Sequence, residues 1–165
     1  MGHPPPIVTT PSRMSLLMTA TVPTPVARFD NAAFACGAAQ VRAHYRHLAT
    51  VVTITGRIDT ANVDPATEYT RRFVLAKDAL ILDLSDVNIS AAEAISFVNT
   101  VAEDCRAAGV ECTLVASDAV VDLLDDFDDE TLLPIASSVH EALHSFADVI
   151  ATRRQLLLPL IKKTA

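Results

Sequence analysis

The residues best suited to chemistry in this sequence lie where a short apolar run gives way to a new apolar period. Ser90 offers a hydroxyl that could carry a phosphoryl group, and Glu93 follows it at the S-x-x-E spacing of a capping box. A helix that begins here presents free N–H groups and the positive end of its dipole, which favour anionic groups. A regulatory phosphate could therefore be held at this junction. The spacing favours a second role for Ser90, as the N-cap of the helix.

Other clusters of polar residues give weaker signals. The acidic residues between positions 122 and 130 lack the alternating order of a calcium loop, and we interpret them as a solvated face. Two histidine pairs, at 44 and 47 and at 140 and 144, have no evident third ligand, so no metal site is expected. We find no phosphate-binding loop, nucleophile elbow or framed carboxylate pair. The sequence therefore predicts neither an enzyme nor a bound cofactor.

Composition narrows the class of partner and the compartment. The chain has 165 residues, with 13 Lys and Arg against 20 Asp and Glu, and a formal charge of -7. Nucleic-acid binding depends on basic residues, so a nucleic-acid partner is not expected. No segment approaches the ~20 apolar residues of a membrane span. Three cysteines without C-x-x-C spacing fit reduced thiols, and Cys105 and Cys112 are expected to be buried. We expect a cytoplasmic protein without an integral membrane segment.

The elements that would position the junction alternate along the chain. Two strands, 40–46 and 50–55, precede a helix at 60–75, and the central strand at 79–84 leads to a helix at 91–108. A strand at 110–116, a short helix at 119–127, a weak strand at 132–136 and a helix from 138 to about 151 follow. The order β-β-α-β-α-β-α-β-α predicts an α/β fold. Its central sheet is expected to be mostly parallel and flanked by helices.

Segments of unusual composition flank this folded region. Residues 1–38 are rich in Pro and Thr and predict a mobile leader. Residues 39–150 form the predicted domain. Residues 151–165 form an apolar extension with basic residues at both ends, which could lie on a membrane surface or pack on the domain or a second subunit. We prefer packing on protein, which includes formation of a homodimer.

Several short motifs in this order resemble those of STAS domains. They are Gly56-Arg57-Ile58-Asp59 after the second strand, Leu82-Asp83-Leu84-Ser85 with Val87, Gly109-Val110, Leu133-Pro134-Ile135, and the run from Val139 to Leu143. The resemblance spans about residues 39–148. With no membrane-spanning region, the chain is similar to stand-alone bacterial anti-sigma factor antagonists. This resemblance implies binding of an anti-sigma factor, often a serine kinase with a histidine-kinase-like ATPase fold, which frees a sigma factor.

The resemblance also identifies a substitution at the phosphorylation site. The usual family run, Asp-Ser-Ser-Gly-Leu, falls on residues 91–95, and Glu93 occupies the position of the second serine, the phosphoacceptor. In that family, phosphorylation at this position breaks the complex with the anti-sigma factor. Glu93 could imitate the phosphorylated state, with about half the charge of a phosphate, and so disfavour the usual kinase partner, or it could serve as the capping-box carboxylate. Ser90 is the remaining candidate for phosphorylation.

We therefore predict a non-catalytic regulator that sequesters an anti-sigma factor. Its partner surface is expected to include Asp86, Asn88, Ser90 and Glu93. The alternatives are a phosphorylation-independent scaffold that oligomerises and a module that binds a small anion or nucleotide.

Overall fold

A computed structural model describes residues 2–3, 33–126 and 133–162. Within these ranges the chain alternates strands and helices as expected. The elements, in chain order, are β1 (Ala33–Cys36), β2 (Ala39–Arg46), β3 (Ala49–Ile58), α1 (Val63–Leu75), β4 (Leu80–Ile89), α2 (Ala91–Ala108), β5 (Cys112–Ala116), α3 (Asp118–Asp125), β6 (Ile135–Ala136) and α4 (Val139–Lys162).

The six strands form one sheet in the order β1-β2-β3-β4-β5-β6. The β1–β2 and β2–β3 pairs are antiparallel. The pairs from β3 to β6 are parallel. The prediction of an α/β fold with a mostly parallel sheet is confirmed. One strand was missed, because β1 lies within the range that we assigned to a leader; residues 4–32 of that range lie outside the described residues.

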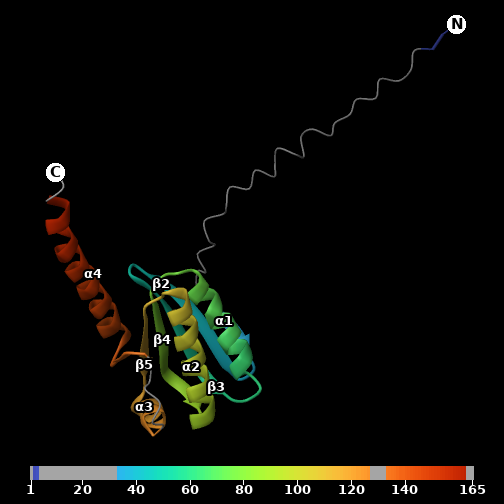
Figure 1. The fold of residues 1–165 in the computed structure, drawn as a ribbon. Coiled ribbons are helices and arrows are strands. Elements are labelled where there is room, and N and C mark those ends of the chain that lie inside the picture. The colour runs from blue at the N-terminus through green and yellow to red at the C-terminus, as the bar shows by residue number, and fades with distance from the viewer. Residues whose placement is uncertain (1, 4–32, 127–132, 163–165) are drawn as a thin grey trace.

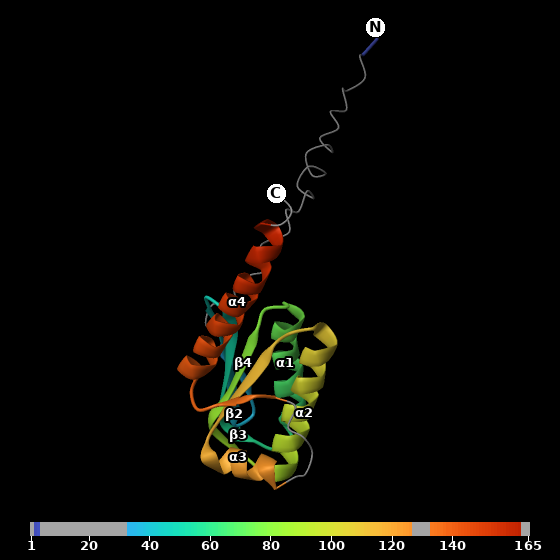
Figure 2. The same ribbon diagram turned by 60° about the vertical axis from the view of Figure 1, so that its left-hand side comes forward.

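Hydrophobic side chains on the two faces of the sheet build two cores of unequal size. The larger core lies under α1, α2 and α3 and includes Leu82, Phe97 and Leu114. The smaller core lies on the other face, where Ala142 and Phe146 of α4 pack on β3, β4 and β5. Figures 1 and 2 show α1 and α2 side by side on one face and α4 across the sheet from them. The first halves of β3 and β4 and most of β5 are buried on both faces for this reason.

The central strand β4 is longer than predicted. We expected it to end near Leu84 in a turn, but it continues to Ile89. Thr53 pairs with Asp83 and Thr55 pairs with Asp86, so one residue of β3 lies opposite two residues of β4. This β-bulge lets the polar run after Leu84 remain in the sheet. The Ser85 N–H and hydroxyl both donate to Asp83 Oδ1, at 3.1 and 2.6 Å.

The first helix begins three residues later than predicted because a side chain organises the preceding turn. Asn62 is 5% exposed and accepts a hydrogen bond from the Asp59 N–H through Oδ1, at 2.8 Å. Its Nδ2 donates to the carbonyls of Cys36 and Arg57, at 3.0 and 2.8 Å. These bonds hold residues 59–62 in a turn and attach β1 to the end of β3.

The last helix runs well past the domain limit that we predicted at residue 150. Its first half packs on the sheet, whereas residues 151–159 are all exposed and project from the body (Figure 2). Arg153 is ion-paired with Glu111, at the point where the helix leaves the body. Within the described residues no helix is long and apolar enough to cross a membrane.

Candidate functional site

The strand-to-helix junction exists as predicted, but its capping box does not form. Ser90 is the N-cap of α2 and its carbonyl accepts a hydrogen bond from the Ala94 N–H at 2.9 Å, yet its side chain makes no cap hydrogen bond. The Ser90 side chain is exposed, so water can satisfy both its hydroxyl and the first N–H groups of the helix. The predicted exchange of bonds with Glu93 is therefore wrong, and the Ser90 hydroxyl is not committed to the helix.

A surface hollow of about 570 Å³ lies at this junction. It brings together three of the four residues predicted for the partner surface, namely Asn88, Ser90 and Glu93. Asp86 does not line it. Asp86 lies two residues before Asn88 on β4 and pairs with Thr55 of β3, so it borders the hollow along the strand. We call the lining residues, which also include Arg57, Ile58, Asp59, Thr60 and Ile89, the α2 N-terminal surface.

Sequence reasoning missed Arg57, Asp59 and Thr60 as members of this surface. β3 and β4 are parallel, and Arg57 lies opposite Asn88 in their register. Carboxyl ends of parallel strands meet at the same edge of a sheet, where ligands commonly bind. The signal was present, because the run from Gly56 to Asp59 ends one strand just as the run from Val87 to Ser90 ends its neighbour.

The α2 N-terminal surface carries charges of both signs with no ion pair of their own. Arg57 is exposed and Asp59 and Glu93 are half-buried. None of the three forms an ion pair within the described residues. The Asp59 carboxylate accepts a hydrogen bond from the Ala61 N–H at 2.9 Å, which fixes its position in the turn. The Asp59 carboxylate and the unpaired Arg57 guanidinium can both form hydrogen bonds or ion pairs with a protein partner.

The other polar clusters remain outside this surface. His140 and His144 are exposed on α4, and the His144 ring contacts Asp148 at 3.3 Å. Among the described residues no group of His, Cys, Asp and Glu has the arrangement of a metal site. The acidic stretch that we interpreted as a solvated face continues through Asp128, Asp129 and Glu130, which lie outside the described residues.

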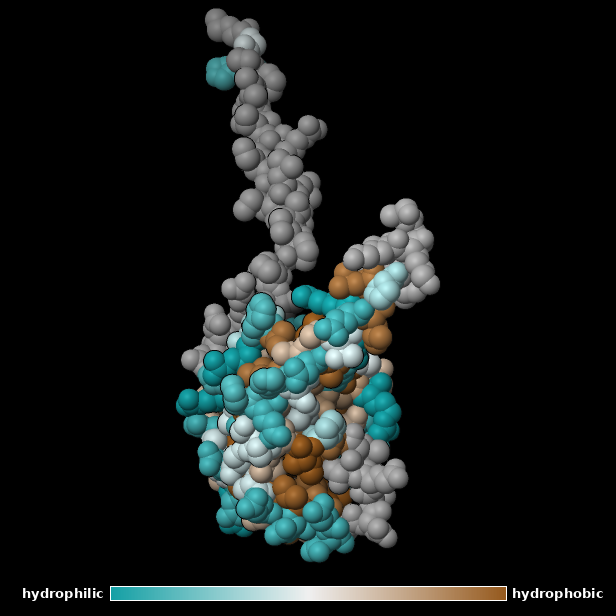
Figure 3. Space-filling model, turned by 90° about the vertical axis from the view of Figure 1, so that its left-hand side faces the viewer, coloured by the Kyte–Doolittle hydropathy of each residue, from teal (hydrophilic) through white to brown (hydrophobic). Residues whose placement is uncertain are grey.

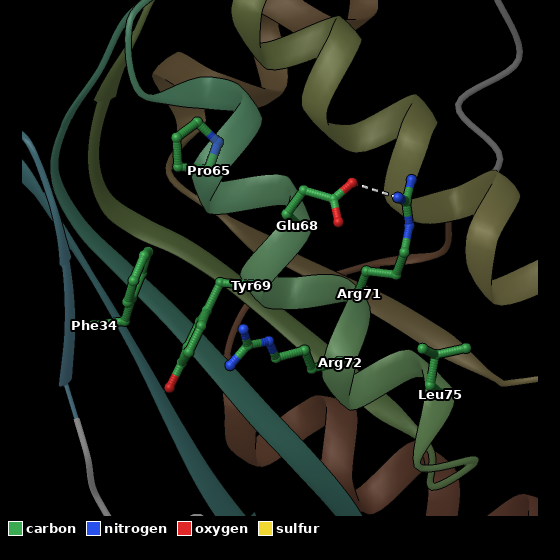
Figure 4. A pocket seen from close by; sticks show the side chains of 7 residues that line it. All are labelled: Phe34, Pro65, Glu68, Tyr69, Arg71, Arg72 and Leu75. Atoms are coloured by element: carbon green, nitrogen blue, oxygen red, sulfur yellow. Dashed lines mark hydrogen bonds and ion pairs between the residues drawn. The ribbon is translucent and has the colours of Figure 1, made fainter.

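A second, smaller hollow of about 280 Å³ lies between β1 and α1 (Figure 4). Phe34 stacks on Tyr69 with ring centroids 4.4 Å apart, and the Arg72 guanidinium lies 5.5 Å from the Tyr69 ring centroid. Arg71 points the other way, donating to Asp104 of α2 at 2.8 Å. The aromatic stack attaches β1 to α1, so we attribute the side chains around this hollow to packing between the two elements and not to ligand binding.

Comparison with known proteins identifies the family. A model of the STAS domain matches residues 38–142. Osmosensory protein A of Mycobacterium tuberculosis is 49% identical over an alignment of 158 residues, and the match covers 90% of this chain and all of that protein.

Two solved structures share the fold. One is an anti-sigma factor antagonist from Mycobacterium paratuberculosis, at 19% identity and a TM-score of 0.53, covering 66% of this chain and 94% of that one. The other is the anti-sigma factor antagonist SpoIIAA in its unphosphorylated form, at 11% identity and a TM-score of 0.53, covering 66% and 96%. The match over residues 38–142, the relative along nearly the whole length and the shared fold together place this chain in the STAS domain family.

Proposed function

We propose that this protein is a non-catalytic regulator that binds and sequesters an anti-sigma factor through the α2 N-terminal surface. The observation that carries the proposal is the hollow at the ends of β3 and β4, where Arg57, Asn88 and Glu93 are gathered with no ion pair among them. Family membership and the two antagonist structures support this choice of partner. Asp86 extends the surface along β4.

Glu93 supplies a fixed negative charge at the third residue of α2. Because the resemblance places the family's phosphoserine at this position, the carboxylate imitates the phosphorylated state in part. It has about half the charge of a phosphate and lacks the third oxygen. It also interacts favourably with the positive end of the helix dipole. We infer that this fixed charge, and not phosphorylation at position 93, sets the affinity for the anti-sigma factor.

A binding titration against purified anti-sigma factors, including kinase-type ones, tests the proposal. We expect the parent chain to bind one of them, and Arg57→Ala or Asn88→Ala to weaken that complex at least tenfold. Glu103→Ser is the matched control, because Glu103 is an exposed residue of the same helix, about 15 Å along its axis from Glu93. Binding by none of these proteins would reject the antagonist function and favour the scaffold alternative.

The same titration with Glu93→Ala and Glu93→Ser separates the two roles of the carboxylate. If Glu93 imitates a phosphate, both variants bind the anti-sigma factor more tightly than the parent does. Equal affinity for parent and variants, with a lower thermal midpoint for the variants, would assign Glu93 to helix stabilisation only.

We also propose Ser90 as a phosphorylation site, since its exposed hydroxyl makes no cap bond. Treatment with a serine kinase followed by peptide mass spectrometry should locate a phosphate on Ser90, and Ser90→Ala should abolish it. A phosphate found elsewhere, or none, would remove Ser90 from the proposal.

A second candidate function is the binding of a small anion or nucleotide in the same hollow. It is favoured by the unpaired Arg57 guanidinium beside the start of α2. Phosphate and nucleotides should then raise the thermal midpoint of the parent but not of Arg57→Ala. No shift at millimolar ligand would reject this function.

We place the regulator in the cytoplasm, where a sigma factor acts, and propose that it responds to osmotic stress. The support is the name of the 49% identical relative, osmosensory protein A. Deleting the gene in the source bacterium should alter the set of transcripts induced by a salt upshift. An unchanged set would reject this role.

A further inference from the structure

The projecting half of α4, residues 151–162, carries three exposed leucines in a row. We call it the α4 tip. Leu156, Leu157 and Leu158 are 67%, 56% and 55% exposed. Figure 3 shows apolar side chains gathered at this projecting end and again lower on the body. Exposed apolar patches of this kind mark interaction surfaces.

The apolar stripe of the tip continues the stripe that packs on the sheet. Ala142 and Phe146 are buried against the smaller core, and Val149 follows on the same helical face. At a spacing of three to four residues the face continues through Arg153 to Leu156 and Leu157. Figure 1 shows the C-terminal half of α4 projecting away from the sheet. Arg153 is still ion-paired with Glu111 of the body, whereas Leu156 and Leu157 beyond it are exposed and offer an apolar face to a protein partner.

A groove of about 460 Å³ lies beside the first half of α4, where β5 and β6 form the edge of the sheet. We call it the β6–α4 groove. Leu133, Ile135, Phe146 and Val149 supply apolar lining, and Glu111 and Glu141 place carboxylates at it. Ile135 is 43% exposed and Val149 is 38% exposed. The groove thus offers an apolar floor whose borders carry two carboxylates and the Arg106 guanidinium, and one of the carboxylates, Glu111, is ion-paired with Arg153 of its own chain.

Charge decides which partner fits the tip. Residues 151–165 contain four basic residues and no acidic one, whereas residues 1–150 contain nine basic and all 20 acidic residues, a net of -11. An acidic body opposes the approach of the tip to an anionic bilayer. Two tips packed on each other would bring like charges together. A basic, apolar tip fits an apolar groove on an acidic body, and the chain itself supplies such a groove.

We propose that two copies of this chain exchange their α4 tips, each tip lying in the β6–α4 groove of the other copy. The two α4 helices then run antiparallel, because each tip lies along the first half of the other helix. The interface is isologous, with a two-fold axis near the middle of α4, and it closes as a dimer. Each tip, about 18 Å long, buries its leucines against Ile135, Phe146 and Val149 of the other copy. The α2 N-terminal surface is not part of this interface.

Sedimentation equilibrium of the full chain tests the dimer. We expect the parent to be dimeric at about 50 μM, and the double variant Leu156→Glu, Leu157→Glu to be monomeric. Ile135→Glu should also be monomeric, because it places a charge on the groove floor. Leu75→Glu is the matched control: Leu75 is 69% exposed and lies on α1, so this variant should remain dimeric. A monomeric parent, or a dimer that survives both the tip and groove changes, would overturn the proposal.

A mixing experiment distinguishes exchanged tips from other modes of association. When the tip variant and the groove variant are mixed, an intact tip of one can enter the intact groove of the other, so a heterodimer with one seated tip should form. Pairing of tip with tip predicts instead that Ile135→Glu alone stays dimeric, which would overturn the exchange. Binding of a monomeric parent to phosphatidylglycerol vesicles would assign the tip to a membrane and also overturn it. Far-ultraviolet circular dichroism spectra that match that of the parent confirm that the variants fold.

Discussion

At the scale of single residues, the site depends on the buried side-chain amide of Asn62, which the sequence did not mark as a functional residue. Asn62 joins three backbone groups from β1, β3 and the β3–α1 turn. The turn positions Asp59 and Thr60 beside the start of α2. Buried polar side chains of this kind specify one local arrangement because each unmade bond is costly.

Replacing Asn62 with Ala should lower the free energy of unfolding by about 2 kcal/mol, since two carbonyls and an N–H lose their partner. Urea denaturation with unchanged m-value measures the loss. Asn88→Ala is the control, because Asn88 is exposed and its replacement should cost under about 0.5 kcal/mol. Equal losses for the two variants would contradict the role of Asn62.

The three cysteines are free, as predicted, and all are buried, which was predicted for Cys105 and Cys112. The hydrogen bond with Cys105, together with burial, raises the pKa of Cys112, and burial raises the pKa of Cys36. The thiolate is the reactive form, so Cys36 and Cys112 should not react with Ellman's reagent at pH 8 while the protein is folded. The hydrogen bond with Cys112 lowers the pKa of Cys105, and this thiol should stay unreactive because it is 2% exposed. All three should react after unfolding in urea. A thiol of the folded protein that reacts within seconds would contradict this burial.

At the scale of elements, β1 shows how tertiary contacts can make a strand from four residues. It lies at the edge of the sheet and pairs with β2 alone. Phe34 stacks on Tyr69, and the Cys36 carbonyl accepts a bond from Asn62. Neither partner is adjacent in sequence, so local patterns could not predict this strand.

Two glycines with positive φ should differ in their tolerance of alanine. A Cβ at Gly56, with φ of 91°, would lie 2.3 Å from the Ala38 carbonyl oxygen, whereas a Cβ at Gly109, with φ of 69°, meets nothing within 4 Å. Gly56→Ala should therefore cost about 3 kcal/mol, and Gly109→Ala about 1 kcal/mol. Thermal or urea unfolding of both variants measures the difference. Similar losses in the free energy of unfolding would mean that the positive φ, and not the contact with the Ala38 carbonyl oxygen, limits substitution at Gly56.

At the scale of the whole molecule, charge is divided between an acidic body and a basic helix end. Every acidic residue lies before Ala151, while four of the 13 basic residues follow it. The ion pair of Arg153 with Glu111 shows the same attraction within one chain. Such a division favours association of the tip with an acidic surface.

Association of the exchanged dimer should weaken as salt screens this attraction. Raising NaCl from about 50 to 500 mM should increase the dimer dissociation constant roughly tenfold. Sedimentation equilibrium at both salt concentrations measures the change. A dissociation constant that falls with salt would indicate that apolar contact alone drives the association.

The sequence by itself determined the alternation of strands and helices, because apolar periodicity and capping positions are local properties. It also determined the junction at Ser90, since α2 begins at Ala91 as predicted. It could not determine that β4 continues past Leu84, because a polar run remains in the sheet only through its pairing with β3. Nor could it determine whether the Ser90 side chain forms a cap hydrogen bond, because the spacing of Ser90 and Glu93 is the same whether or not the bond forms.

Only the tertiary structure decided which residues share the site. Arg57 and Asp59 are separated from Glu93 by more than 30 positions, and parallel pairing of β3 with β4 brings them to one hollow. Likewise, the sequence of the C-terminal segment could not predict the length of α4. The helix continues beyond the residues that pack on the sheet, and the leucines of that part are exposed. Pairing and packing act between distant segments, and for that reason they decided the two surfaces on which the proposals depend.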